Sequence, residues 1–328
     1  MEAMLIHSPL ASHSFTSTAT GVNIHVYFQD RRGNIEIASY NPKSGWTTGS
    51  KGSPGKAHLN NGIAVTGWNN GNEVLELSTA YSSIERVYFI GEGDKIVERC
   101  YSKGKEGWYE GVLTGMVTTA HYSSLSAIRL DVRGTGFIRV YYQDKDNAIR
   151  EVCKDGVGKW FYGHKFPPAI QGTSISCSQI PGKGFYHWLF YQKPDTTFVE
   201  HLMREGSQWK EGPFKSDRVY GPGAYIACVS YGEDNHHVFT IDSGNRLCLT
   251  EFNTGSQSWY VTGTLTDAIP SSPVAAIPVA SFTSRIRIYF QTRGDQIAEW
   301  GTNDGTKYRV ERYHLPIATP TAISRSAV

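Results

Sequence analysis

Short segments of alternating hydrophobic and polar residues recur along the chain, and each is followed by a polar turn. In Arg139-Val-Tyr-Tyr-Gln143, positions 139, 141 and 143 share one face of an extended chain, and positions 140 and 142 share the other. Successive side chains of a β-strand point to opposite faces, so this period-two pattern predicts a half-buried strand. The polar residues 144–147 and the second alternating run at 148–152 extend the prediction to an antiparallel hairpin.

The hairpin phrase occurs six times at intervals of roughly 50 residues, which is the length of a four-stranded propeller blade. Its copies begin at His25, Arg86, Arg139, Trp188, His237 and Arg287. A further strand opens with an aromatic residue, at Trp46, Trp108, Trp160, Trp209, Trp259 and Tyr308. The remaining strand lies upstream of copies two to six, at 62–68, 124–130, 174–180, 224–231 and 274–281. These units predict an all-β fold, a six-bladed β-propeller with four-stranded antiparallel blades.

The repeats assign residues 1–318 to a single domain, and the polar segment 319–328 is predicted to be a frayed C-terminal tail. An open sheet edge exposes unpaired backbone groups, so we expect one terminus to complete the other's blade when the ring closes. For this reason, residues near 9–17 are expected to pair in the first or the last blade.

Composition agrees with a β-rich fold and argues against several partners. The chain has 19 tyrosines, 8 tryptophans and 34 glycines, which strands and tight turns favour. A formal net charge of +2 gives no electrostatic footprint for nucleic acid, and no apolar run is long enough for membrane insertion. The N-terminus lacks the apolar core of a signal peptide, so we expect a cytoplasmic protein or one released by a non-classical route.

Cysteine and histidine spacing predicts neither disulfides nor a metal site. The five cysteines are odd in number and show no close CxxC spacing, which favours free thiols buried on strands. His236 and His237 are adjacent on a predicted strand, where their side chains point to opposite faces. We therefore predict no metal ion and no cofactor.

Three copies carry an arginine at the first position of the phrase and a glutamate twelve residues later. The pairs are Arg86 with Glu98, Arg139 with Glu151, and Arg287 with Glu299. A symmetric hairpin whose turn centres on Lys145 would place Arg139 directly opposite Glu151. The equivalent centres, Glu92 and Arg293, also fall in turn-like sequence. One such pair would be read as a surface ion pair of about 0–1 kcal/mol. Three pairs at one spacing indicate a polar fork, because guanidinium donors and carboxylate acceptors match vicinal sugar hydroxyls.

The aromatic residue nine or ten positions after each of these glutamates supplies an apolar surface. Sugars bind partly by laying their C–H faces on an indole or phenol ring. Packing between blades is the alternative role for these tryptophans. Tyr27, Tyr88, Tyr141 and Tyr289, each two residues after the first position of the phrase, are expected to be core residues.

The phrase Arg-Val-Tyr-Tyr-Gln-Asp, followed by Ile-Arg-Glu and then Trp, resembles the repeat of the fungal fucose-specific lectins over essentially the whole chain. The resemblance implies a multivalent lectin that binds L-fucose, fucosylated oligosaccharides and glycoconjugates in pockets between blades. In that family, the Arg and Glu of one blade hold the hydroxyls, and aromatics of the next blade pack against the apolar face and the methyl group. It implies no cofactor, and it allows a homodimer.

Carried over residue by residue, the resemblance implies three fucose pockets. Their members are Arg86, Glu98 and Trp160; Arg139, Glu151 and Trp209; and Arg287, Glu299, Tyr40 and Trp46. The family often has a second aromatic, three residues after the glutamate position of the next blade. Tyr40 supplies it for the third pocket, whereas Lys154 and Met203 stand there for the first two. The Arg287 pocket is therefore expected to be the most complete.

The other three copies depart from this pattern. Copies one and five have His25 with Ile37 and His237 with Leu249. Neither pair can form the charged fork, so little or no fucose binding is expected there. The fourth copy has Trp188 and Glu200, faced by Phe252 and Trp259. These four residues form either an altered carbohydrate site or packing between blades, and we favour packing.

Two other functional classes remain as alternatives, namely a protein-interaction propeller with degenerate sugar sites and a glycosidase-type propeller enzyme. Glycosidases need two carboxylates across the sugar, one of them with a raised pKa. Each repeated glutamate here is instead paired with an arginine, which is expected to depress the glutamate pKa. We therefore predict no enzymatic activity.

Overall fold

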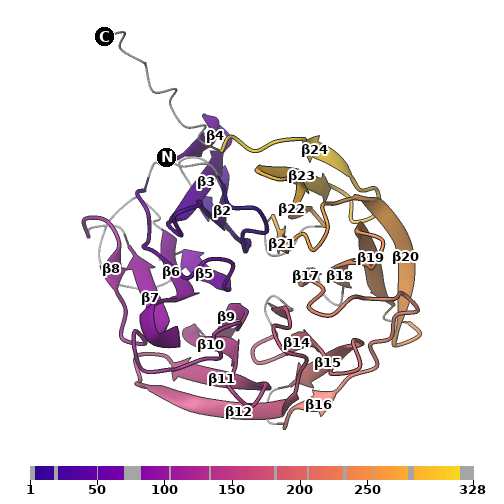
Figure 1. The fold of residues 1–328 in the computed structure, drawn as a ribbon, viewed down its shortest axis with the longest axis horizontal. Coiled ribbons are helices and arrows are strands. Elements are labelled where there is room, and N and C mark those ends of the chain that lie inside the picture. The colour runs from indigo at the N-terminus through magenta and orange to yellow at the C-terminus, as the bar shows by residue number, and fades with distance from the viewer. Residues whose placement is uncertain are drawn as a thin grey trace.

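Six four-stranded antiparallel sheets stand around a common axis in the computed structural model (Figure 1). The structure describes residues 4–17, 21–49, 51–69, 83–102, 105–132, 134–180, 183–204, 207–231, 235–253, 255–279 and 284–317. The predicted six-bladed β-propeller is confirmed, whereas the predicted tail at 319–328 lies outside the described residues. Among the described residues, no helix has the length and apolar character of a membrane span.

Each blade is built from four consecutive strands, with the first at the axis and the fourth at the rim (Figure 1). Blade one contains β1 (Ala11–Ser17), β2 (Gly21–Gln29), β3 (Ile35–Asn41) and β4 (Gly45–Thr48). Blade two contains β5 (Ile63–Asn69), β6 (Ser83–Ile90), the 3-10 turn η2 (Glu92–Asp94), β7 (Ile96–Tyr101) and β8 (Tyr109–Glu110). Blade three contains β9 (Leu125–Val132), β10 (Thr135–Gln143), β11 (Ala148–Asp155) and β12 (Trp160–Pro168).

The second half of the ring repeats this order. Blade four contains β13 (Ile175–Gln179), β14 (His187–Gln192), β15 (Phe198–Met203) and β16 (Lys210–Glu211). Blade five contains β17 (Ile226–Tyr231), β18 (Asn235–Ile241), β19 (Arg246–Asn253) and β20 (Ser258–Asp267). Blade six contains β21 (Val274–Pro278), β22 (Ile286–Arg293), β23 (Gln296–Thr302) and β24 (Arg309–Arg312).

The hydrophobic core lies between blades, where the faces of neighbouring sheets meet. One cluster joins Ile90 of blade two to Val140 of blade three, and equivalent clusters occur around the ring. Tyr88 and Tyr141, from the second strands of these blades, are completely shielded from solvent. A single blade would leave both of its apolar faces in water, so the blades are stable only as a ring.

The hairpin register differs from the symmetric one expected from the sequence. Arg139 lies opposite Cys153 rather than Glu151, and Glu151 lies opposite Tyr141. The cause is the turn, in which Asn147 adopts a left-handed conformation at φ 62° and adds a residue to the loop. The hairpin therefore centres one residue later than Lys145, and the same shift occurs in blades two and six. Arginine and glutamate still share one face, but they are diagonal neighbours.

Residues 11–17 pair within the first blade, as expected, but neither terminus completes the other's blade. Strand β1 pairs with β2 inside blade one, and blade six takes its four strands from one continuous segment. Neither blade has a vacancy, so the ring closes by packing of β1 against β21. Met4 and Leu10 lie in the same hydrophobic cluster as Tyr289 of blade six. The Ser14 hydroxyl donates to the Pro278 carbonyl at 2.6 Å.

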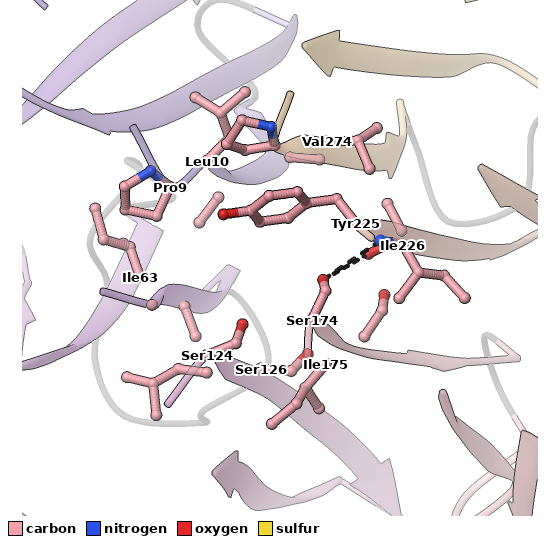
Figure 2. A pocket seen from close by; sticks show the side chains of 18 of the residues that line it. Pro9, Leu10, Ile63, Ser124, Ser126, Ser174, Ile175, Tyr225, Ile226 and Val274 are labelled. Atoms are coloured by element: carbon pink, nitrogen blue, oxygen red, sulfur yellow. Dashed lines mark hydrogen bonds between the residues drawn. The ribbon is translucent and has the colours of Figure 1, made fainter. Parts of the chain in front are cut away.

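The first strands of all six blades line a central cavity of about 130 Å³ (Figure 2). Small residues dominate its wall, including Ser124, Ser126 and Ser174. Two serines also tie neighbouring inner strands together, since Ser126 Oγ accepts from the Cys177 N–H at 3.0 Å and Ser176 Oγ accepts from the Cys228 N–H at 2.9 Å. Burial raises the pKa of the Cys177 thiol to about 12, so this thiol is protonated and structural.

Candidate functional site

Three arginine–glutamate pairs lie on the second and third strands of their blades. They are Arg86–Glu98 on β6 and β7, Arg139–Glu151 on β10 and β11, and Arg287–Glu299 on β22 and β23. The first pair is in direct contact, and the Nε–Oε1 distances in the other two are 3.8 Å and 3.7 Å. The glutamate side chains are only 0–8% exposed, so these pairs are not surface ion pairs.

Each glutamate is fixed by donors other than its arginine. The hydroxyls of Tyr88, Tyr141 and Tyr289 donate to Oε1 of the glutamate of their own blade, at 3.3, 3.0 and 3.1 Å. In two blades a backbone N–H donates to Oε2, from Leu113 to Glu98 and from His164 to Glu151, both at 3.0 Å. These bonds set the carboxylate orientation before a ligand arrives, which lowers the entropic cost of binding.

The tyrosine hydroxyls are functional groups that the sequence prediction missed. Tyr141 is buried, as predicted for a core residue, but it also positions Glu151. The sequence pattern that could have revealed this role is the alternation of side chains along the strand, which places Arg139 and Tyr141 on one face of β10. Burial, together with the nearby Glu151 carboxylate, holds the pKa of Tyr141 well above its usual range, so the hydroxyl remains a donor.

Two glycines make room for these carboxylates. A Cβ atom at Gly111 would lie 2.2 Å from Glu98 Oε2, and one at Gly163 would lie 2.3 Å from Glu151 Oε2. Any side chain at these positions would displace the glutamate from its arginine. The sequence carries a weak signal for them, because each glycine follows its glutamate by twelve or thirteen residues.

A tryptophan of the following blade lies beside the tyrosine that bonds each glutamate. Trp160 lies 6.3 Å from Tyr88, Trp209 lies 6.2 Å from Tyr141, and Trp46 lies 6.1 Å from Tyr289, measured between ring centroids. All three contacts are edge-to-face, with interplanar angles of 85°, 86° and 78°. The structure thus builds one arrangement three times, and each copy requires two adjacent blades.

The indole N–H groups distinguish the three pockets. Those of Trp160 and Trp209 are buried and have no hydrogen-bond partner in the described structure. A buried donor without a partner costs roughly 1–3 kcal/mol, so each of these two N–H groups is an unsatisfied donor within its interface. The Trp46 side chain instead interacts with the Glu299 carboxyl.

The third pocket also contains the second aromatic that was predicted for it. Tyr40 lies across from Trp46 in the β3–β4 ladder, with ring centroids 5.6 Å apart. Lys154 takes the equivalent place opposite Trp160 in blade three. Burial raises the pKa of the Glu299 carboxyl despite the nearby Arg287. The expectation that arginine depresses the glutamate pKa is therefore wrong for this pocket, because desolvation of the carboxylate outweighs the attraction.

Comparison with known proteins assigns this chain to a family. The family model described as fungal fucose-specific lectin matches residues 10–318. The chain belongs to this family. It is 28% identical to the fucose-specific lectin of Aspergillus fumigatus, over 90% of this chain and 93% of that protein. It is also 28% identical to the Aleuria aurantia lectin, over 96% and 97% of the two chains. The crystal structure of the A. aurantia lectin, a six-bladed propeller, matches with a TM-score of 0.83 at 25% identity, covering 98% of this chain and 100% of that one.

In this member of the fungal fucose-specific lectin family, the blade four–five interface brings together the four residues predicted there. Trp259 Nε1 and the Phe214 N–H both donate to Glu200 Oε2 at 2.9 Å. Trp188 is 4% exposed, and Phe252 lies 5.2 Å from Trp259 between centroids. Burial raises the pKa of Glu200 to about 7. With Trp188 in place of arginine, the glutamate is enclosed by aromatic rings.

At the blade one–two interface of this family member, other side chains of the protein occupy the place of the arginine–glutamate pair. Glu85 of blade two is completely buried and accepts from the Tyr27 hydroxyl and from Lys51 Nζ. His25 Nδ1 lies 2.9 Å from Glu85 Oε2. The arginine and glutamate that are missing from blade one are thus replaced by a network within the protein.

In blade five a histidine–glutamate pair stands in place of the arginine–glutamate pair. His237 lies directly opposite Glu251 in the β18–β19 ladder, with Nε2 2.9 Å from Oε1. Tyr308 of blade six contacts the other ring nitrogen, His237 Nδ1, at 2.5 Å. The histidine is 4% exposed, so its ring nitrogens are already bonded within the protein.

Proposed function

We propose that this protein is a lectin that binds L-fucose and fucosylated glycans in three pockets, between blades two and three, three and four, and six and one. The observation that carries the proposal is one composite arrangement built three times from a buried arginine–glutamate pair and a tryptophan of the next blade. The relatives compared above are named fucose-specific lectins. Variants of the A. aurantia lectin have been solved with α-methyl-L-fucoside and with Fucα1-6GlcNAc.

The chemistry of each pocket suits a neutral deoxy sugar. The guanidinium donates to hydroxyl oxygens, and the fixed carboxylate accepts from hydroxyl hydrogens, so vicinal hydroxyls satisfy both groups. The indole ring covers an apolar sugar face and the methyl group. Repetition around one ring makes binding to a surface with many fucosylated chains multivalent.

Binding without hydrolysis is part of the proposal. The compared relatives are lectins. Cleavage of a glycosidic bond needs two carboxylates that flank it, and the charged partner of each pocket glutamate is an arginine. We expect no release of p-nitrophenol from p-nitrophenyl α-L-fucoside during prolonged incubation.

Calorimetric titration with methyl α-L-fucoside tests the proposal, and about three sites per chain are expected. Replacing Arg86, Arg139 and Arg287 together with alanine should abolish the heat of binding. Each charged anchor contributes about 1.5–3 kcal/mol, or roughly 10- to 150-fold in affinity.

Arg246→Ala is the matched control, because Arg246 forms an Asp242 ion pair at the turn of blade five, away from the three pockets. This variant should bind as the wild type does. Retention of the triple variant on immobilised L-fucose would contradict the proposal. Equal retention of the wild type on immobilised galactose would overturn the sugar assignment.

A further inference from the structure

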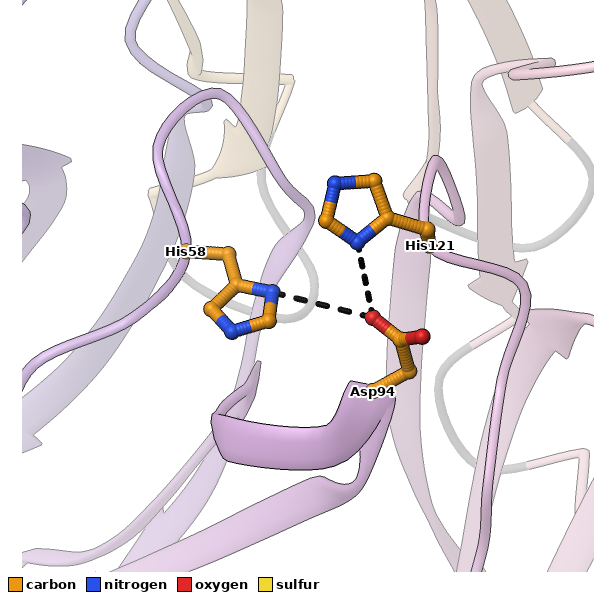
Figure 3. A group of neighbouring side chains, drawn as sticks. All are labelled: His58, Asp94 and His121. Atoms are coloured by element: carbon orange, nitrogen blue, oxygen red, sulfur yellow. Dashed lines mark hydrogen bonds and ion pairs between the residues drawn. The ribbon is translucent and has the colours of Figure 1, made fainter.

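His58, Asp94 and His121 converge beside the β6–β7 turn of blade two (Figure 3). Arg86 pairs with Cys100 at one end of the β6–β7 hairpin, and Asp94 lies in the turn at the other end. His121 Nδ1 is 2.8 Å and His58 Nδ1 is 3.7 Å from Asp94 Oδ1. The three ligand atoms all lie within 4.8 Å of one another.

Backbone hydrogen bonds hold the three residues in place. The His58 N–H donates to the Ile90 carbonyl at 3.0 Å, which fixes the loop before β5 to blade two. The Thr119 N–H donates to the Asp94 carbonyl at 2.8 Å, and the Asn61 amide donates to the His121 carbonyl at 2.6 Å. These bonds, none of which involves an imidazole ring, hold three separate loops around the cluster.

The repeats indicate that the fold does not need histidine at these positions. In the following blades, Ala120 and Ile170 occupy the place of His58 and make the same backbone bond, to the carbonyls of Gln143 and Gln192. Gln171 similarly follows Ile170 where His121 follows Ala120. The expectation of no metal site did not anticipate this cluster, because its three members come from separate loops and no spacing along the chain connects them.

One buried ring nitrogen of the cluster makes no hydrogen bond. His58 Nδ1 is buried and makes no hydrogen bond, although it faces Asp94 at 3.7 Å. A buried polar atom of this kind usually has a protein partner or an ordered water or ion. Neutral imidazole and carboxylate are also the common protein ligands of zinc.

We propose that His58, Asp94 and His121 form a binding site for a divalent transition metal of the zinc class. Two ligands about 2.0–2.1 Å from a tetrahedral ion lie about 3.4 Å apart, and the distances of 2.8 Å and 3.7 Å fall on either side of that value. The His121 side chain is 72% exposed, so its ring can move to complete the geometry. Three protein ligands and an open side leave a fourth position for water or an outside donor.

The test uses the full-length protein after dialysis against EDTA. Titration with Co²⁺ should produce visible d–d absorption that saturates near one ion per chain, and Zn²⁺ should displace the cobalt. Asp94→Asn, His58→Ile and His121→Gln should each weaken Zn²⁺ binding at least tenfold in calorimetry. All three substitutions copy the chain's own repeats, since Asn147, Ile170 and Gln171 stand at the equivalent positions.

Asn147 shares the left-handed backbone of Asp94, with φ values of 62° and 58°, so Asp94→Asn should preserve the turn. Thermal unfolding of the metal-free variants should match that of the metal-free wild type. His314→Gln, at an exposed histidine outside the cluster, should bind Zn²⁺ as the wild type does. Absence of saturable binding to the wild type, or undiminished binding to Asp94→Asn, would overturn the proposal.

Discussion

Two residues after the first position of the repeat, blades one, two, three and six have tyrosine, whereas blades four and five have Phe190 and Phe239. In the three blades with the full arginine–glutamate pair the hydroxyl donates to the glutamate of that pair, whereas the Tyr27 hydroxyl of blade one donates to Glu85. The hydrogen bond to the glutamate restricts the carboxylate, and a phenylalanine in the same core position fills nearly the same volume. Positioning of the carboxylate and packing of the core can therefore be separated by removing one oxygen atom.

Tyr141→Phe should weaken methyl α-L-fucoside binding in the blade three–four pocket. Loss of one hydrogen bond to Glu151 is expected to cost about 0.5–1.5 kcal/mol, or roughly 2- to 13-fold in affinity. The measurement is calorimetry in an Arg86→Ala/Arg287→Ala background, where this pocket alone retains its fork. Tyr191→Phe, which removes a buried hydroxyl that contacts His201, should leave the affinity unchanged. Equal weakening by both substitutions would point to packing instead.

At the scale of strands and blades, the sequence predicted the six repeats and the residues that the structure brings together at each interface, but not the hairpin register. A symmetric hairpin was assumed, and the left-handed Asn147 shifts the pairing by two positions along the strand. Because side chains alternate with period two, a shift of two keeps Arg139 and Glu151 on one face. The predicted pairing survived for this reason, while Gly163 could not be predicted, since its role depends on where the outer strand crosses Glu151.

The blade four–five interface shows what happens when the arginine is replaced. Glu200 keeps its position, but tryptophan donors and burial take the place of the guanidinium. Desolvation disfavours the carboxylate form and raises the pKa of Glu200 to about 7. The protonated form is therefore favoured by folding, and stability should depend on pH in a defined window.

Glu200 should make the protein less stable as the pH rises from about 5 to 8. Below pH 4.5, the pKa of Glu200 in the unfolded chain, the carboxyl is protonated in both states and its stabilisation of the fold is complete. This stabilisation is lost as the pH rises through about 7, the pKa of Glu200 in the folded protein. Urea unfolding of the wild type and of Glu200→Gln isolates the effect, because other titrating groups cancel in the difference. The wild type should lose about 1–3 kcal/mol more than the variant across this window. Parallel pH profiles for the two proteins would contradict the assignment.

At the scale of the whole molecule, the pockets are properties of the ring rather than of any blade. Each one takes its charged pair from one blade and its indole from the next, so the Arg287 pocket exists only because blade six meets blade one. The sequence indicated a closed ring but not how it closes, since β1–β21 packing involves no motif. Three of the six interfaces carry the full fork, and the others are filled by Lys51, by aromatic rings or by His237.

Three pockets on one rigid ring should bind a fucosylated surface more tightly than their single-site affinity predicts. A variant with Arg86→Ala and Arg139→Ala retains only the ring-closing pocket. Its calorimetric affinity for methyl α-L-fucoside should equal that of one wild-type site, with a stoichiometry near one. On a dense fucosylated surface, however, its dissociation should be faster by about 100-fold or more, because no second pocket holds the molecule during release. Surface plasmon resonance at low and high ligand density distinguishes the two quantities. If dissociation of the double variant matched the wild type at high density, then multivalency would have to come from another source, such as self-association or the remaining interfaces.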